Sequence, residues 1–158
     1  MATFGTFADG QVLSAAELNA AGTYTAYTPT WTQSATITKT TNLGQYMLFN
    51  KLVVANFSMT ATSAGTANNV IVVGLPVTAS ANNSLLGQAY LIDVSVGVSG
   101  TLYPLVAAYL TTTTMAFYAG GGNETDYATG QAGLTASLVP VTIASGDIIV
   151  GSITYRAA

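Results

Sequence analysis

The chain has 158 residues, of which half are hydrophobic and only 6% are charged, and three basic against six acidic side chains give a net charge of −3. A typical domain is about a quarter charged, so the surface of this one must be formed mostly by Thr, Ser, Asn, Gln, Gly and Ala. Nucleic-acid binding and attachment to an anionic membrane both need a basic patch, and membrane insertion needs an apolar run of about 18 residues or more, so we expect neither kind of partner.

Residues 1–24 differ from the rest of the chain. Ser14 and Glu17 form a capping-box pattern, which predicts a helix of one to two turns that ends near Gly22. A helix this short is not stable alone in water. The same segment carries isolated large apolar side chains, among them Phe4, Phe7, Leu13 and Leu18. We therefore predict an N-terminal arm that docks on another protein through these side chains; the alternative is a segment that folds back on its own domain.

Residues 25–158 show the two-residue period of β-strands. Tyr27, Pro29 and Trp31 alternate with threonines, and Pro29 cannot donate to a ladder, which places it at a sheet edge or a strand entry. No helix is predicted after residue 22, and there are some eight β-prone stretches, which are separated by turns except that 111–118 continues 102–110. They lie in 24–32, 44–60, 70–73, 85–98, 102–110, 111–118, 134–139 and 148–155. This spacing predicts a second domain, 25–158, that is an all-β sandwich or closed barrel.

The stretch 44–60 predicts a β-hairpin with its turn at Asn50-Lys51, because Asn tolerates the positive φ that a two-residue turn requires. With Phe49 opposite Leu52, alternation gives the hairpin one apolar face for the core. That face carries Tyr46, Leu48, Val53, Ala55, Phe57 and Met59. The second face is also apolar near the turn, where it carries Met47, Phe49, Leu52 and Val54. A single chain needs only one apolar face, so the second predicts burial against another chain in an oligomer.

The residues that support most catalytic chemistry are missing from the chain. It contains no His and no Cys, which excludes Ser-His and Cys-His nucleophiles and most transition-metal sites. One Gly-rich loop, 119–130, contains two carboxylates beside polar and aromatic side chains, namely Asn123, Glu124, Asp126 and Tyr127. A solvated loop is the preferred interpretation of these four residues, and contact with a sugar or Ca²⁺ is the alternative. We expect no enzyme activity, no cofactor and no metal centre.

The order of several short motifs resembles that of small structural proteins of tailed bacteriophages. The opening 7–20, FADGQVLSAAELNA, is similar to their N-terminal segment, and the remaining motifs are similar to their jelly-roll module. Those motifs are Tyr27-x-Pro29-x-Trp31, Gly44-x-Tyr46, Lys51-Leu52-Val53, Leu75-Pro76, Ser145-Gly146-Asp147 and Tyr155-Arg156. One departure is Asn50, which stands where a Gly often closes the hairpin.

The resemblance implies an antiparallel jelly-roll sandwich of the tumour-necrosis-factor-like shape, assembled as a homotrimer and attached to a virion by its N-terminal arm. Such proteins serve as minor tail proteins, capsid decoration or head-fibre proteins, or receptor-binding tips. The first hypothesis is therefore a structural protein at the virion surface, assembled in the cytoplasm of the host bacterium and bound to other capsid or tail proteins. The second is a module that binds a host-surface glycan through the loop at Asn123, Glu124, Asp126 and Tyr127.

Overall fold

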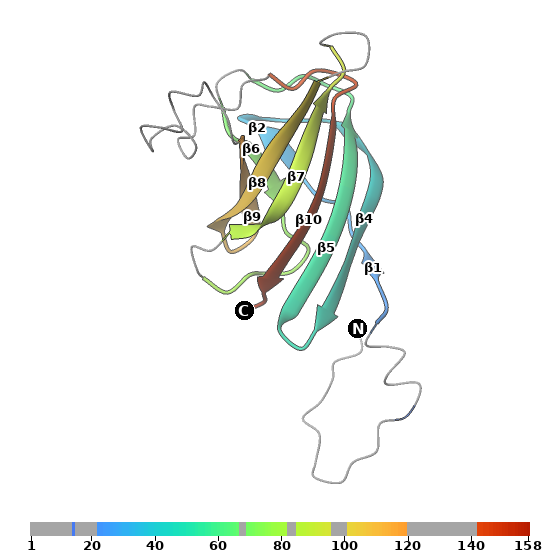
Figure 1. Ribbon diagram of the computed structural model, residues 1–158, viewed down its shortest axis with the longest axis vertical. Helices are drawn as coiled ribbons and strands as arrows, with labels where there is room; N and C mark the ends of the chain where they lie inside the picture. The colour runs from blue at the N-terminus through green and yellow to red at the C-terminus, as the bar shows by residue number, and fades with distance from the viewer. Residues whose placement is uncertain (1–13, 15–21, 67–68, 82–84, 96–100, 120–141) are drawn as a thin grey trace.

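A computed structural model describes residues 14, 22–66, 69–81, 85–95, 101–119 and 142–158 of the chain (Figure 1). Within these residues the protein is all-β, as the sequence predicts, and contains no helix. The predicted helix after Ser14, the predicted strand 134–139 and the Gly-rich loop lie outside the described residues. The strands are β1 Thr25–Ala26, β2 Trp31–Gln33, β3 Ala35–Thr36, β4 Lys39–Phe49, β5 Leu52–Ala61, β6 Ile71–Gly74, β7 Leu85–Asp93, β8 Thr101–Thr111, β9 Thr114–Ala119 and β10 Ile148–Arg156.

All ten strands belong to one antiparallel sheet with the order β1-β4-β5-β10-β7-β8-β9-β6-β2-β3. The sheet curls, so that β2 and β6 lie behind β5, β10 and β7 in Figure 1. The chain between β1 and β2 runs from one end of the sheet to the other: at one end the Tyr27 amide donates to the Gly44 carbonyl beside β1, and at the other the Gly74 amide donates to the Thr30 carbonyl beside β2. The four strands β10-β7-β8-β9 form a Greek key, since β7 to β9 follow one another and β10 returns beside β7.

The hairpin of β4 and β5 forms as the sequence predicts. Phe49 pairs with Leu52, and Asn50 between them has a φ of 53°. The predicted alternation is also confirmed along β5, where Val53, Ala55, Phe57 and Met59 are buried. A β-bulge near Asn42 shifts the register farther from the turn, and the Asn42 amide there donates to the Thr60 hydroxyl over 2.8 Å.

The core lies inside the curl, between β5, β10 and β7 on one side and β2, β6 and β9 on the other. Phe57 of β5 and Phe117 of β9 meet across it with ring centroids 5.9 Å apart in an edge-on arrangement. A second link is Tyr155, whose hydroxyl donates to the Val77 carbonyl at 2.7 Å and accepts from the Val77 amide at 3.1 Å. Burial raises the pKa of Tyr155 to about 12. These contacts hold the inner sides of β5 and β10 against β9 and the loop at Val77.

Candidate binding surface

The outer side of β4, β5, β10, β7 and β8, which we call the outer face, is the side seen in Figure 1. The strand register arranges its side chains in rows that cross the strands. One row, the upper apolar band, contains Leu43, Val150, Tyr90 and Pro104 and one polar residue, Ser58, between Leu43 and Val150; Ile92 and Leu102 lie beside it. Leu43, Tyr90, Leu102 and Val150 are large apolar side chains between 38% and 57% exposed. Apolar side chains gathered in this way mark interaction sites, whereas single exposed ones do not.

The next row is polar and contains Gln45, Asn56, Ser152 and Gln88, one from each of β4, β5, β10 and β7. We call it the polar band. Within the described part of the chain, no hydrogen bond of these four side chains is found. Asparagine, glutamine and serine side chains can each donate and accept. The band therefore offers uncharged donors and acceptors together, all directed outward.

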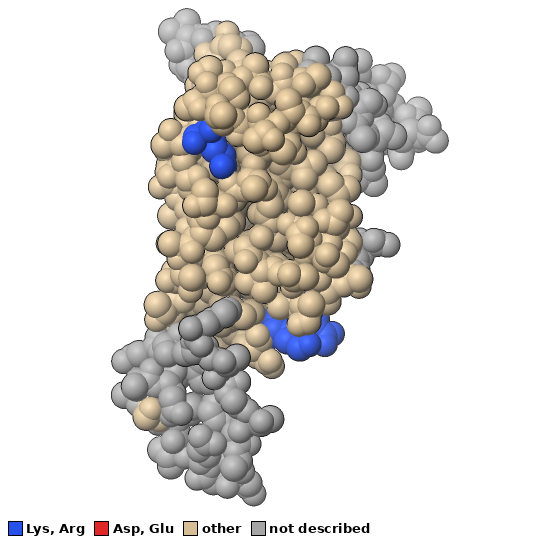
Figure 2. All heavy atoms as spheres, turned by 180° about the vertical axis from the view of Figure 1, so that it is seen from behind, with Lys and Arg blue, Asp and Glu red and all other residues tan. Residues whose placement is uncertain are grey.

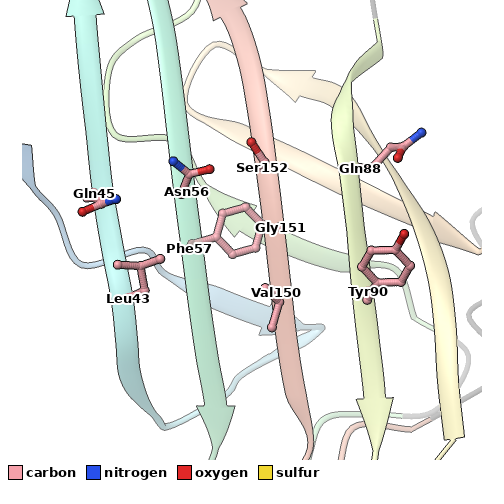
Figure 3. A pocket seen from close by; sticks show the side chains of 9 residues that line it. All are labelled: Leu43, Gln45, Asn56, Phe57, Gln88, Tyr90, Val150, Gly151 and Ser152. Atoms are coloured by element: carbon pink, nitrogen blue, oxygen red, sulfur yellow. The ribbon is translucent and has the colours of Figure 1, made fainter. Parts of the chain in front are cut away.

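A shallow groove of about 570 Å³ lies where the polar band meets the upper apolar band. Figure 3 shows the lining side chains around β10, with the Phe57 ring behind Gly151. Gly151 has no Cβ to keep that ring away: one built there would lie 2.9 Å from Cε1 of Phe57 and 3.0 Å from Cβ of Ala89. Gly151 thus allows a large core ring to pack directly against the backbone of β10, on the inner side of the groove. No charged residue lines it.

The remaining rows, at the hairpin end of the face, carry the four residues predicted from the sequence as an oligomer interface. Met47 pairs with Val54 and Phe49 pairs with Leu52, so the four lie together. Phe49 is 50% and Leu52 is 48% exposed. Lys51 and Arg156 line a second hollow with them. The view from behind in Figure 2 shows two patches of basic side chains and no acidic ones, so the described surface is nearly uncharged there as well.

Two acidic residues of the described chain, Asp93 and Asp147, are buried at the end of β7 and the start of β10. The Asp147 carboxylate accepts from the amides of Ala144 at 2.7 Å and Val94 at 3.0 Å. Burial is the main cause that raises the pKa of Asp147, and the nearby Asp93 carboxyl adds to it, while the two amide hydrogen bonds act in the opposite direction. Both carboxyls hold loops in place, and neither reaches the groove.

We expect Asp147→Asn to remove a pH-dependent part of the stability. Because the pKa of Asp147 is raised above 3.8 in the folded protein, folding favours its protonated form. This contribution is complete below the unfolded pKa and is lost as the pH rises through the folded one. The difference in unfolding free energy between wild type and variant, measured by urea titration from about pH 3 to 8, should therefore fall with rising pH. A difference that is the same at every pH would contradict this explanation.

The structure does not test the roles predicted from the sequence for the other functional residues. Phe4, Phe7, Leu13 and Leu18 of the arm lie outside the described residues. So do the loop residues Asn123, Glu124, Asp126 and Tyr127. In the described ranges there is no group of three or more acidic side chains that could hold a metal ion, and no helix that could span a membrane.

No family model, no curated protein and no solved structure matches this chain. The resemblance to phage structural proteins therefore remains a prediction from the motifs. The fold and the outer face must carry the functional argument.

Proposed function

We propose that this chain is a non-enzymatic structural protein of a bacteriophage virion, displayed at the virion surface as a homotrimer and anchored by its N-terminal arm, residues 1–24. The observation that carries the proposal is the apolar outer side of the β4–β5 hairpin. Phe49 and Leu52 are about half exposed in the single chain, and only 6% of the residues of the chain are charged. Such a surface favours assembly, since obligate interfaces are large and hydrophobic.

The fold supports the finer jelly-roll assignment in one respect. A jelly roll contains two Greek keys, and the order β10-β7-β8-β9 supplies one. Fold alone does not select among capsid decoration, head-fibre and minor tail proteins. The glycan-binding alternative depends on the loop around Glu124, and no observation on the described residues favours it.

Deletion of residues 1–22 tests the anchoring part of the proposal. We expect the truncated protein to keep its β content and trimeric state, and to lose its association with particles. Each large apolar side chain of the arm that is buried in a partner groove contributes about 1.5–3 kcal/mol, and three arms on one trimer bind with avidity. The measurements are circular dichroism, light scattering, and cosedimentation with virions that lack the wild-type protein.

One control variant and two alternative outcomes make the result interpretable. Gly22→Ala in the full-length chain should bind particles normally, because a Cβ there meets no heavy atom within 4 Å. If the truncated trimer still occupies particles fully, the arm is not the anchor. If the truncated chain does not fold, the arm is instead part of the domain.

A further inference from the structure

We infer that the whole outer face of β4, β5, β10, β7 and β8 is the surface through which copies of this chain associate, with the polar band forming hydrogen bonds between subunits. The inference rests on the self-association in the proposed function. It extends the predicted contact from the hairpin end, Met47, Phe49, Leu52 and Val54, to a complete sheet face with a defined pattern.

The outer face has the size that a stable interface needs. β10 contains nine residues, Ile148–Arg156, and is the middle one of the five strands. With strands about 4.8 Å apart and a rise of about 3.3 Å per residue, the face covers about 700 Å². A specific interface buries about 800 Å² on each partner. The four hairpin-end residues alone would cover only a small part of this area.

The pattern of the face also resembles that of an interface. Mainly apolar rows lie on both sides of the polar band, with Tyr90 and Val150 on one side and Met47 and Val54 on the other; each row also contains one hydroxyl residue, Ser58 and Thr154 respectively. Tyrosine, phenylalanine and methionine are enriched at interfaces, and charged residues are depleted at their centres. The described charges near this face, Lys51 and Arg156, lie at its hairpin end.

The polar band indicates that the partner is a second copy. Asn56, Gln88 and their neighbours in the band each donate and accept, so a band made of them is complementary to another copy of itself. A row of carboxylates or of ammonium groups would repel its own copy. The uncharged groove offers nothing to a charged partner, and a neutral saccharide seated in it would leave the apolar rows exposed.

The first test uses the absence of Cys, because any introduced cysteine is the only thiol in the chain. Ser152→Cys places that thiol in the polar band with almost no change in size. Thr36→Cys is the matched control, since Thr36 is exposed on β3, outside the five strands. In the native oligomer we expect maleimide to label Cys at position 152 at least about tenfold more slowly than at position 36, because burial blocks access of the reagent. In denaturant the two rates should be equal. Equal rates in the native protein would overturn the inference.

The second test measures assembly by light scattering and sedimentation equilibrium. Tyr90→Glu should convert the oligomer to monomer with an unchanged circular dichroism spectrum, and Thr36→Glu should not. Asn56→Leu should weaken association about ten- to a hundredfold, because it leaves polar groups of the facing subunit without partners.

The outcomes separate this inference from the proposed function. If Phe49→Asp dissociates the oligomer while Tyr90→Glu and Asn56→Leu do not, the protein self-associates through the hairpin end alone and the inference fails. If the wild type is monomeric at micromolar concentration, self-association itself is wrong. Binding of a neutral polysaccharide by a monomer, abolished by Tyr90→Glu, would also overturn the inference and assign the groove to a sugar.

Discussion

Phe57→Ala should lower the free energy of unfolding by about 3–5 kcal/mol, the usual cost of removing a buried phenylalanine ring. Phe57 is fully buried, and its ring contacts Phe117 across the core. The loss should appear in urea denaturation of the folded protein. Leu110→Ala is the control, because Leu110 is 43% exposed and its truncation should change stability by no more than about 0.5 kcal/mol.

Because Phe57 packs under Gly151, we expect the effects of Phe57→Ala and Gly151→Ala on stability to depend on each other. Gly151→Ala alone should destabilise the protein by about 1–3 kcal/mol, because the added methyl group meets the Phe57 ring and Cβ of Ala89. In the Phe57→Ala background the main obstacle is gone and the methyl group fills part of the cavity. The double variant should therefore be more stable than the sum of the single effects, by about 0.5–3 kcal/mol. Additive effects would show that Phe57 does not form the floor beneath Gly151.

Gly87→Ala should cost about 3 kcal/mol or more, at the upper end of overpacking effects, because the obstacle is backbone. A Cβ at position 87 would collide with the Ser152 carbonyl oxygen and lie 2.9 Å from Cα of Ile153. No side-chain rotation can relieve this contact, so β7 and β10 must move apart where Gly87 pairs with Ile153.

Thermal and urea unfolding of Gly87→Ala and Gly22→Ala provide a matched comparison. Gly22→Ala adds the same methyl group where no heavy atom lies within 4 Å. It should therefore leave the unfolding free energy within about 0.5 kcal/mol of wild type. A stable Gly87→Ala variant would mean that the pairing of β7 with β10 is looser than the structure shows.

The sequence predicts those parts of the fold that local chemistry controls. The hairpin turn could be placed because Asn50 adopts a positive φ that most residues avoid. The turn between β8 and β9 was missed, and 111–118 was taken as a continuous β-prone stretch. Its residues Thr112-Thr113 contain no Gly, Asn or Pro signal; hydroxyl contacts support the turn instead, such as the one of 2.6 Å between Thr111 and Thr114.

Alternation failed where a register shift intervenes. Strict alternation along 85–98 predicts that Leu86 shares a face with Gln88 and Tyr90, but the irregularity between Leu85 and Gly87 turns Leu86 into the core. An inserted residue reverses the facing of every side chain on one side of it. The predicted strand 85–98 is also too long, because β7 ends at Asp93.

The candidate surface was predicted only in part, because most of it depends on strand pairings that are distant in sequence. Met47, Phe49, Leu52 and Val54 belong to one hairpin, so their common face follows from local pairing. The polar band draws Gln45, Asn56, Ser152 and Gln88 from four strands, and β10 pairs with β5 and β7 far away in sequence. A signal was present, since each of the four is a polar residue at an outward position between apolar neighbours in its strand. The strand order that brings them together could not be read from the sequence.

The central position of β10 has a consequence for how the protein folds. β10 is the last strand in the chain, yet it lies between β5 and β7. The β4–β5 hairpin and the β7–β8–β9 meander can form from local contacts, but until β10 inserts, β5 and β7 present open edges that can pair with other chains. Pairing so distant in sequence is also slow. Folding therefore passes through a two-part intermediate that is prone to misassemble, and completion of the curled sheet depends on the insertion of β10, Ile148–Arg156.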